Sequence, residues 1–565
     1  MCGIVGFAKS DCLRDVLDAL KTLEYRGYDS AGVAYLKENG IGVRKRVGGV
    51  DGLRGLAHKS ADYAIGHTRW ATHGKVSRIN AHPHVVGDWA IVHNGIITNY
   101  LALRGELERL GHKFLSSTDS EVIAHLLDQG GGHGDVLSAI RYAMGKLEGS
   151  YAVAVFCRHS PHRIYLFKRG NPLVVGKGDG FGCFASDTPA LVAYTQRVYK
   201  MQDGEIAAVG KREILFWTED GEDGGSKRQF GLTSLTPSHV AKGDYDTYMR
   251  KEIDEIPLVV SETYQAYAHP PQGWREDVDR WLLIGCGTAY HACLTAGWGR
   301  AKVSSEFDGA DVDEHTGVIA VTQSGETADT LSAMRRAADN GAWVVAVTNV
   351  PNSSATHLAH LVLQTKAGAE IAVAATKSFN AQLAVLKRIG EWLGVGTPSP
   401  SPDRALAETI AASRDLERLG GRRWDTVFLL GTGRDYVTCL EGGLKLKEIA
   451  YCHCETCYSG EIKHGPLALV TAKTLVIVVC TEERGIDPSM TALAEVSSRG
   501  ATTLVISGYE GLLSHADYGV RLPEVKGWEE NASIIPLQLL ALHSALARGN
   551  DPDRPRNLAK SVTVK

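Results

Sequence analysis

The chain has 565 residues, which at about 100–200 residues per domain predicts three or four domains. Hydrophobic residues make up 44% and charged residues 22%, as in ordinary globular proteins, and a net charge of -4 argues against a nucleic-acid-binding protein. No basic segment precedes Cys2, and no apolar run approaches the ~18 residues of a membrane span, so we expect a cytoplasmic protein without signal peptide or membrane partner.

The first part of the chain, from Met1 to about Phe216, is rich in short β-like runs. Helical patterns occur near Asp11–Leu23 and Asn99–Leu110. Strands that follow one another without helices between them predict antiparallel sheets with packed helices. The runs are Ala31–Leu36, Tyr63–Thr68, Trp89–His93, Tyr151–Cys157 and Arg163–Lys168.

A segment rich in Gly, Asp and Glu, Thr218–Lys227, predicts a surface linker. After it, strands alternate with helices, one of which carries Leu331 and Met334. Such alternation predicts a parallel α/β sheet, and its recurrence predicts two similar units in tandem. The strands expected are Trp281–Ile284, Gly317–Val321 and Trp343–Val347, then Thr426–Leu430, Leu475–Val479 and Thr503–Ile506.

Two of these strands end in Gly-x-Gly turns, at Gly285–Gly287 and Gly431–Gly433, which invites a dinucleotide interpretation. The third glycine of that motif would fall at Tyr290 and Tyr436, and it has a packing role that tyrosine cannot fill. We therefore expect no cofactor.

Cys2 follows Met1 directly, so removal of Met1 would place a thiol and an α-amine on one residue. An α-amine with a pKa of about 7.7–8.0 can activate the thiol, although a lone cysteine is more often a small buried apolar residue. Four polar clusters favour the catalytic interpretation, because together they supply a cation, a carboxylate and oxyanion donors. The clusters are His67–Gly74, Asn80–His84, His93–Ile97 and Ser117–Glu121.

With Cys2–Gly6 and Tyr25–Gly32, these clusters resemble the class II glutamine amidotransferase domain, an αββα N-terminal-nucleophile hydrolase. The resemblance implies that Cys2 attacks the glutamine amide with Asn94 and Gly95 as oxyanion hole. It implies that Arg69 and Asp119 hold the amino acid, with Thr72, His73 and His82 in the pocket. From local signals alone, Asn94–Gly95 also favours a hairpin turn and Asp119 a helix N-cap.

The segment Thr322–Thr327 lies between an expected strand and an expected helix. Backbone amides at a helix N-terminus favour a bound anion, and the hydroxyls of Thr322, Ser324 and Thr327 can add donors, although ordinary N-capping would use the same residues. This half of the chain resembles the sugar isomerase (SIS) domain, present twice. The implied sugar-phosphate contacts are Gly287, Thr288, Thr322, Gln323, Ser324, Thr327, Val373 and Ala559.

The whole chain resembles the glutamine–fructose-6-phosphate aminotransferase family (glucosamine-6-phosphate synthases). The resemblance implies that Lys560 forms a Schiff base with the open-chain ketose, Glu448 moves a proton between its first two carbons, and His464 opens the ring. Lys445 lies three residues before Glu448, on the same helix face. Without the resemblance, Lys560 reads as a solvated tail lysine and Lys445–Glu448 as a surface ion pair.

The implied reaction converts L-glutamine and D-fructose 6-phosphate into L-glutamate and D-glucosamine 6-phosphate. Ammonia would pass through a channel gated by Trp70, in a homodimer. The expected domains are a glutaminase at 2–217, a linker at 218–243, SIS domains at 244–400 and 401–550, and a catalytic tail at 551–565.

Two positions depart from the family pattern, since Ala289 and Ala375 replace serines near the sugar phosphate. A different ketose phosphate as acceptor therefore stays as an alternative. A phosphosugar-binding regulatory protein with an idle glutaminase fold is a further alternative, which a basic helix-turn-helix would favour, and the sequence contains no such pattern. Cys452, His453, Cys454 and Cys457 form a dense patch that could share a helix face, but a zinc site needs four matched ligands, so we expect no metal.

Overall fold

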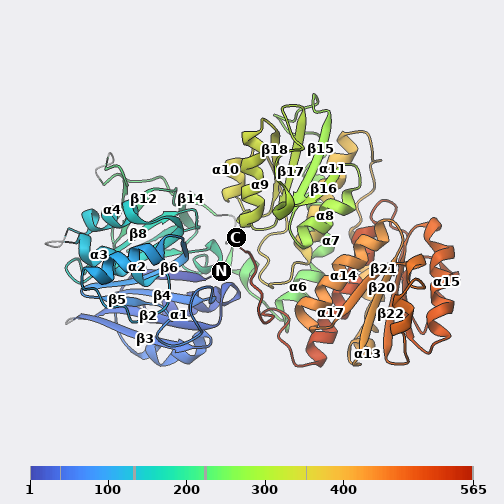
Figure 1. Cartoon of the computed structure of the whole chain (residues 1–565), viewed down its shortest axis with the longest axis horizontal. Coiled ribbons are helices and arrows are strands. Elements are labelled where there is room, and N and C mark those ends of the chain that lie inside the picture. Colours follow the sequence, from blue (N-terminus) through green and yellow to red (C-terminus); the bar gives the residue numbers. More distant parts are fainter. Residues whose placement is uncertain are drawn as a thin grey trace. The chain divides into compact units, whose positions relative to one another are not determined.

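The computed structural model describes residues 2–37, 40–131, 135–221, 225–233, 235–351 and 353–562. They form two compact units, one up to Ala241 and the other over Lys242–Lys560 (Figure 1). Parts of the sequence-based expectations lie outside the described residues: Met1, residues 38, 39 and 132–134 of the glutaminase range, residues 222–224 and 234 of the linker, residue 352 of the first SIS range and residues 563–565 of the tail. None of the helices in the described ranges combines the length and apolar character that a membrane crossing requires.

The first unit contains two sheets in which neighbouring strands are antiparallel. One sheet has β1 (Gly3–Ala8), β2 (Ser30–Lys37), β3 (Gly40–Val47), β4 (Tyr63–Arg69), β9 (Val174–Gly178), β10 (Phe181–Ala185), β11 (Arg197–Lys200) and β14 (Gly231–Leu232), in the order β14-β11-β9-β10-β1-β4-β2-β3. The other has β5 (His84–Val86), β6 (Trp89–Ile97), β7 (Gly149–Cys157), β8 (Ile164–Arg169), β12 (Glu205–Val209) and β13 (Ile214–Thr218), in the order β13-β12-β8-β7-β6-β5.

Alternation along the central strands explains why the two sheets stack. On β6, Trp89 and Ile91 pack in a core with the helices, whereas Ala90 and Val92 pack in a second core against the other sheet. Successive strand residues point to opposite faces, so both faces of β6 are buried. The helices are α1 (Leu13–Thr22), which packs on β1 and β4, then α2 (Tyr100–Arg109), α3 (Glu121–Gly130), α4 (Val136–Lys146) and α5 (Pro237–Val240).

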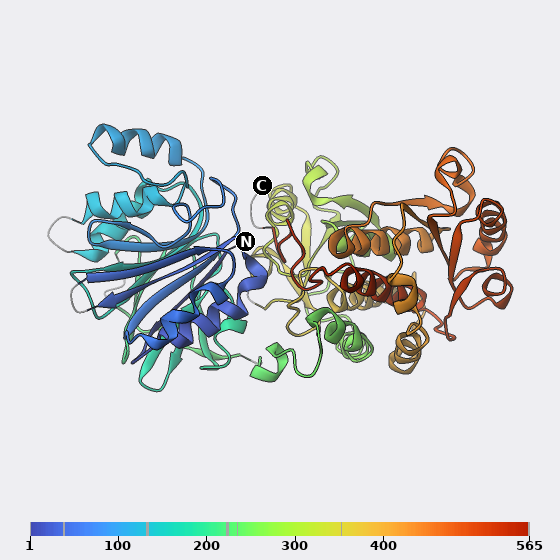
Figure 2. The ribbon, with the colours of Figure 1, turned by 90° about the horizontal axis from the view of Figure 1, so that it is seen from below.

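The resulting layers are helix, sheet, sheet, helix, so the αββα sandwich that the sequence predicted is confirmed. Figure 2 shows the strands of this unit with helices on two sides.

Four buried histidines form a cluster inside the first unit: His67, His82, His84 and His93. The rings of His67 and His82 lie 4.0 Å apart and those of His82 and His84 4.6 Å apart. His67 Nε2 lies 2.9 Å from the carbonyl oxygen of His93, but both ring nitrogens of His82 are buried without a hydrogen-bond partner in the described chain. The His82 side chain is therefore enclosed within the unit.

Burial lowers the pKa of each of the four imidazoles. The pKa of His93 falls to about 4 and that of His84 to about 3, because a charged ring would lose its hydration among its neighbours. The cluster is therefore neutral at physiological pH.

The second unit contains two five-stranded parallel sheets of the same topology. The first has β15 (Arg280–Gly285), β16 (Arg300–Val303), β17 (Thr316–Thr322), β18 (Trp343–Thr348) and β19 (Leu361–Gln364), in the order β16-β15-β17-β18-β19. The second has β20 (Thr426–Gly431), β21 (Cys454–Tyr458), β22 (Thr474–Cys480), β23 (Thr502–Ser507) and β24 (Tyr518–Arg521), in the order β21-β20-β22-β23-β24. The predicted tandem α/β units are thus confirmed.

Helices cover both faces of each sheet, which is why the central strands are continuous apolar runs. One large core extends through both sheets, from Ile319 in β17 to Ile477 in β22. The helices are α6 (Tyr248–Asp254), α7 (Ile256–Gln265), α8 (Thr288–Ala296), α9 (Ala328–Asp339), α10 (Ser354–Leu358), α11 (Lys377–Trp392), α12 (Asp403–Ala412), α13 (Leu416–Gly420), α14 (Arg434–Ala450), α15 (Ile486–Ser497), α16 (Glu510–Leu513) and α17 (Glu529–Ala547).

The neutral histidine cluster makes the first unit sensitive to acid. The folded pKa of His93 lies below the unfolded value of 6.5, so between these values the unfolded chain binds more protons and stability is lost as the pH falls. Lowering the pH from about 7 to about 5 should reduce the free energy of unfolding by about 2 kcal/mol for His93 alone. Urea titrations read by pulse proteolysis, with detection of N-terminal fragments, measure this loss.

His82→Phe removes one titrating ring from the cluster and should flatten the pH dependence. His159, an exposed histidine paired with Asp88, provides the matched control, and His159→Gln should leave the slope unchanged. Equal slopes for all three proteins would show that the cluster does not titrate on unfolding.

Candidate functional site

Cys2 directly precedes β1, at a position fixed by the pairing of Gly3 with Thr68 in β4. Its Sγ accepts a hydrogen bond from the backbone N–H of Trp70 at 3.2 Å. Burial raises the pKa of the Cys2 thiol, against the opposing charges of the α-amino terminus and of the Arg69 guanidinium. The thiol is therefore neutral at rest, and a nearby base is required to make it a nucleophile.

The segment that carries Arg69 and Trp70 is held by Asp29, from the Tyr25–Gly32 motif. The N–H of Asp29 donates to the carbonyl oxygen of Arg69 at 3.0 Å, and its carboxylate accepts from the N–H of Ala71 at 2.8 Å. The Trp70 ring makes an edge contact with Tyr28, with centroids 5.8 Å apart. These contacts set Trp70 beside the Cys2 sulfur.

Asn94 and Gly95 lie within β6, so the hairpin turn that this dipeptide favours locally is wrong. Pairing with β7 over nine residues overrides the local turn preference. Asn94 Nδ2 donates to the carbonyl oxygen of Cys2 at 2.9 Å. Gly95 has φ +122°, and a Cβ there would lie 1.9 Å from the carbonyl oxygen of Ser150, so only glycine fits.

Arg69 and Asp119 are both buried in this unit. The guanidinium donates to backbone carbonyls of the loop after β4, including that of Gly74 at 3.2 Å. Asp119 accepts from the N–H of Ile97 at 2.9 Å, while the residue in the N-cap position of α3 is Ser120. The helix N-cap that Asp119 favours locally is therefore wrong. Thr72 is exposed and His73 half-buried, with His73 Nδ1 3.4 Å from the Thr72 hydroxyl.

In the second unit, the segment 322–327 joins β17 to α9 at the point where the strand order of the first sheet reverses, between β15 and β17. Ligands of open α/β sheets bind at such switch points. The Thr322 hydroxyl accepts from the N–H of Gly325 at 3.2 Å, and that of Ser324 from the N–H of Glu326 at 3.1 Å. Gly325 has φ +67°, and a Cβ would lie 1.9 Å from Ser353 Oγ.

The hydroxyl of Thr327 lies 3.3 Å from that of Thr322, which closes a compact cradle of side-chain and backbone donors. The backbone carbonyl oxygen of Gln323 accepts from the N–H of Asn349 at 3.1 Å. Gly287, with φ +54°, is in the N-cap position of α8 at the other side of the switch point.

Lys445 is completely buried on α14 among polar partners from both sheets' helices. Its Nζ lies 2.6 Å from Glu448 Oε2 and 3.3 Å from Glu441 Oε1, and donates to Thr288 Oγ1 at 3.0 Å. Burial lowers the pKa of Lys445, but the carboxylates of Glu441 and Glu448 outweigh it and the net pKa is raised. The surface ion pair that spacing alone favours is therefore wrong.

Glu441 completes this network. Its Oε1 accepts from the Thr288 hydroxyl at 3.0 Å, and its Oε2 lies 2.7 Å from His291 Nδ1. No role was predicted for Glu441, although its position four residues before Lys445 on one helix could have indicated it.

Lys560 is buried as well, with a side chain only 6% exposed. Its Nζ lies 2.5 Å from Glu370 Oε2 and donates to the carbonyl oxygen of Ala372 at 2.8 Å. The solvated tail lysine expected from local sequence is wrong. Val373 follows in the same loop and is buried, while Ala559 is half-buried.

His464 is exposed and shows no side-chain hydrogen bond to another predicted site residue of the described chain.

The cysteine patch lies largely on β21, so the helix face considered for Cys454 and Cys457 does not exist. Cys452 accepts from Arg548 at 2.7 Å, and Cys454 donates to the carbonyl oxygen of Gly443 at 3.2 Å. In the described ranges no three His, Cys, Asp or Glu side chains are grouped for a metal ion.

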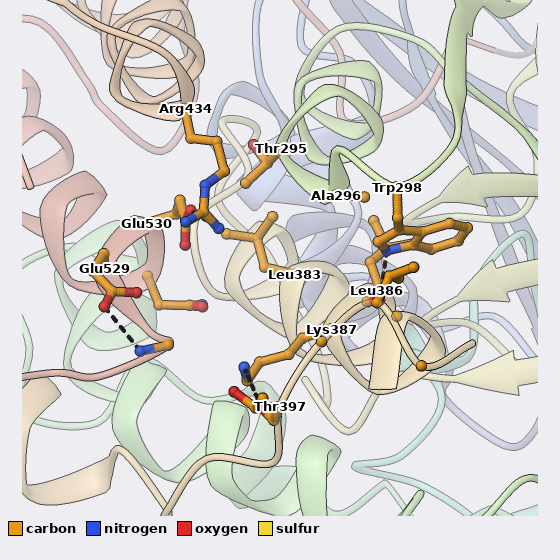
Figure 3. A pocket seen from close by; sticks show the side chains of 16 residues that line it. Thr295, Ala296, Trp298, Leu383, Leu386, Lys387, Thr397, Arg434, Glu529 and Glu530 are labelled. Atoms are coloured by element: carbon orange, nitrogen blue, oxygen red, sulfur yellow. Dashed lines mark hydrogen bonds and ion pairs between the residues drawn. The ribbon is translucent and has the colours of Figure 1, made fainter. Parts of the chain in front are cut away.

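A separate cavity of about 450 Å³ in the second unit contains none of the predicted residues (Figure 3). Its charged groups already have partners: Arg434 pairs with Glu530 at 2.8 Å, and Lys387 donates to the carbonyl oxygen of Thr397 at 3.5 Å. The cradle residues and the Lys445 network therefore lie outside this cavity.

The buried network predicts a large cost for removing the Lys445 ammonium. Lys445→Met should destabilise the second unit by about 3–5 kcal/mol, because two carboxylates would be left without their counter-charge. Lys447→Met changes an exposed lysine on the same helix and should cost less than about 1 kcal/mol. Chemical denaturation of both variants tests this, and equal losses would contradict the described role of Lys445.

Comparisons with known proteins agree with this division of the chain. A family model described as "Glutamine amidotransferase domain" matches residues 43–215, and one described as "SIS domain" matches residues 301–389 and 422–548. A solved structure, the C-terminal domain of glucosamine-fructose-6-phosphate aminotransferase from Francisella tularensis, aligns with a TM-score of 0.49 at 29% identity, covering 56% of this chain and 100% of that chain.

Full-length relatives are more informative. The chain is 40% identical over 614 residues to the glutamine–fructose-6-phosphate aminotransferase (isomerizing) of Symbiobacterium thermophilum, and 39% identical over 620 residues to that of Thermococcus kodakarensis. Both alignments cover 100% of each chain. The chain therefore belongs to the family of isomerizing glutamine–fructose-6-phosphate aminotransferases.

Proposed function

We propose that this chain transfers the amide nitrogen of L-glutamine to D-fructose 6-phosphate, isomerises the product to D-glucosamine 6-phosphate and releases L-glutamate. The names of its full-length relatives support this reaction. The single observation that carries it is the burial of Lys560 against Glu370. Burial shields the amine from water, and lysines that form imines with carbonyl substrates are commonly desolvated in this way.

In the first half-reaction, Cys2 is the N-terminal nucleophile. Loss of Met1 frees its α-amine, which accepts the thiol proton, and the sulfur attacks the glutamine amide carbon. Asn94 Nδ2 and the N–H of Gly95 stabilise the oxyanion that forms. Arg69 binds the glutamine carboxylate and Asp119 its ammonium. Thr72 and His73 line the pocket, and His82 supports it from inside the domain.

In the second half-reaction, the hydroxyls and amides of the Thr322–Thr327 cradle bind the sugar phosphate, aided by Thr288. Gly287, Gln323, Val373 and Ala559 complete the pocket. Lys560 forms the imine with the open-chain sugar, and Glu448 moves the proton between carbon-1 and carbon-2. Lys445 orients Glu448 through their 2.6 Å contact. His464 opens the ring, for which its exposed imidazole is accessible to a ligand.

Ammonia released in the first unit travels through a passage gated by Trp70 and is consumed in the second unit. Channelling has a physical basis, since free ammonia becomes ammonium in neutral water and ammonium is not a nucleophile. We propose that the protein is a cytoplasmic homodimer, and light scattering would test the oligomeric state. We propose domains at 2–217, 244–400 and 401–550, with a linker at 218–243 and a tail at 551–565.

Incubation of the protein with amide-labelled glutamine and fructose 6-phosphate should yield glutamate and a labelled hexosamine phosphate. Unlabelled ammonium in the buffer should not dilute the label if ammonia is channelled. Other ketose phosphates, offered in parallel, test whether Ala289 and Ala375 have changed the acceptor. Glutamate without any aminated sugar would contradict the second half-reaction.

Two variants separate the half-reactions. Cys2→Ala should lower glutamine hydrolysis by a factor of about a thousand or more, while Lys560→Met should keep hydrolysis and lose amino-sugar formation to a similar extent. Lys526→Met, at an exposed position of the second unit, is the matched control. Intact-mass analysis should show that active protein lacks Met1; activity with Met1 retained would exclude the α-amine of Cys2 as base.

A further inference from the structure

Lys560 is held by two acceptors in the second unit. Its Nζ lies 2.5 Å from Glu370 Oε2 and 2.8 Å from the carbonyl oxygen of Ala372, so two of the three N–H groups of an ammonium are satisfied. Both side chains are buried, at 6% exposure for Lys560 and none for Glu370. A buried pair of this kind interacts strongly, because little water screens the charges.

Glu370 is fixed in place by the residues that begin α11. Its Oε1 accepts from the N–H groups of Thr376 and Ser378, each at 3.0 Å, and its Oε2 accepts from the Ser378 hydroxyl at 2.7 Å. Burial raises the pKa of Glu370, but the Lys560 ammonium and the Ser378 donors outweigh it and lower the pKa to about 2. The carboxylate is thus built to stay charged beside a cation.

The other charged groups around this pair do not compete for Lys560. Glu252, on α6, accepts from the N–H of Ile371 at 2.5 Å, and burial, together with the charge of Glu370, raises its pKa to about 8. It therefore carries a proton at neutral pH. Lys377, on α11, pairs with Glu255 at 2.6 Å. Among the described residues, Glu370 is the ionised carboxylate in contact with the Lys560 nitrogen.

We propose that Glu370 is the counter-ion of the Lys560 nitrogen, pairing with an ammonium before the sugar arrives and with a protonated imine afterwards, and holding one proton of the pair in between. This inference rests on the proposed function, in which Lys560 forms the imine. The reason for such a counter-ion is chemical. The carbon of a protonated imine is more electrophilic than that of a neutral imine, and ammonia must attack this carbon.

The proton balance closes within the pair. The Lys560 ammonium passes one proton to Glu370, and the freed electron pair forms a bond to the carbonyl carbon of the sugar. The oxygen takes a second proton from the same nitrogen, which gives a neutral carbinolamine. Glu370 then returns its proton to the hydroxyl, the C–O bond breaks, water leaves, and the nitrogen electron pair forms the protonated C=N bond. The carboxylate faces a cation at the start and at the end.

The test traps the imine with cyanoborohydride, which reduces protonated imines, in the full chain with fructose 6-phosphate and without glutamine. Peptide mass spectrometry measures the adduct on Lys560 from mildly acidic to alkaline pH. Wild type should be trapped well into the alkaline range. In Glu370→Gln the alkaline decline should move to lower pH by about one unit or more, because the cation has lost its counter-charge.

A second readout, the rate at which Lys560 is acylated, should rise in Glu370→Gln, whereas imine trapping at alkaline pH falls. Acetic anhydride acylates neutral amines, and in sugar-free protein at neutral pH it should label Lys560 several-fold faster in Glu370→Gln, because the ammonium has lost the carboxylate that stabilises its charge. Amino-sugar formation should nevertheless be slower. A merely structural role of Glu370 would not raise the reactivity of Lys560 while lowering turnover.

Two further variants make the result specific. Glu370→Asp keeps the charge and should restore trapping at alkaline pH, and it replaces the Gln variant if that protein does not fold. Glu255→Gln removes a carboxylate from the neighbouring pair with Lys377 and should leave the pH profile unchanged. Identical pH profiles for wild type, Glu370→Gln and Glu370→Asp would overturn the counter-ion. Absence of any adduct on wild-type Lys560 would instead overturn the proposed function, and this inference with it.

Discussion

A fully buried ammonium, that of Lys445, links the two tandem sheets of the second unit. Its nitrogen contacts carboxylates on its own helix α14 and the Thr288 hydroxyl at the start of α8, which belongs to the other sheet. A buried charge is tolerated only when its partners are complete. The positions of Thr288 at the start of α8 and of Glu448 on α14 thus depend on one electrostatic cluster.

The two copies in the second unit share a topology but differ in the side chains at the carboxyl ends of their strands. Gly287 and Gly433 occupy equivalent N-cap positions with positive φ, at α8 and α14. Where the first copy has the hydroxyls of the cradle, the second has Glu482, which pairs with Arg434 at 3.1 Å, and Arg484, which lies over Gly433. The shared topology therefore presents different side chains at the equivalent loop of each copy.

Much of the fold could be predicted because the central strands are buried on both faces and read as apolar runs, as in Gly317–Val321 and Leu475–Val479. The edge strands β16, β19, β21 and β24 were missed, since sequences such as Arg300–Val303 carry charged residues and are paired on one side only. At Asn94–Gly95 a strong turn signal was overridden by strand pairing. Local sequence cannot register the energy of contacts with distant strands.

The site was predictable only where residues cluster along the chain. The cradle and the Lys445–Glu448 pair have local spacing, whereas Glu370 and Glu252 carry no local signal and became visible only through their contacts with the loop that holds Lys560. Lys560 itself looked solvated, because burial of a tail residue depends on a partner 190 positions away. Such long-range pairs mark the limit of inference from one sequence.

The raised pKa of Cys2 affects how fast this thiol reacts with oxidants and alkylating agents. Peroxides and alkylating agents attack thiolates far faster than thiols, so a sulfur that rests in its protonated form is a poor target for them. The burial that makes this cysteine slow to ionise also lengthens the time for which it stays chemically intact.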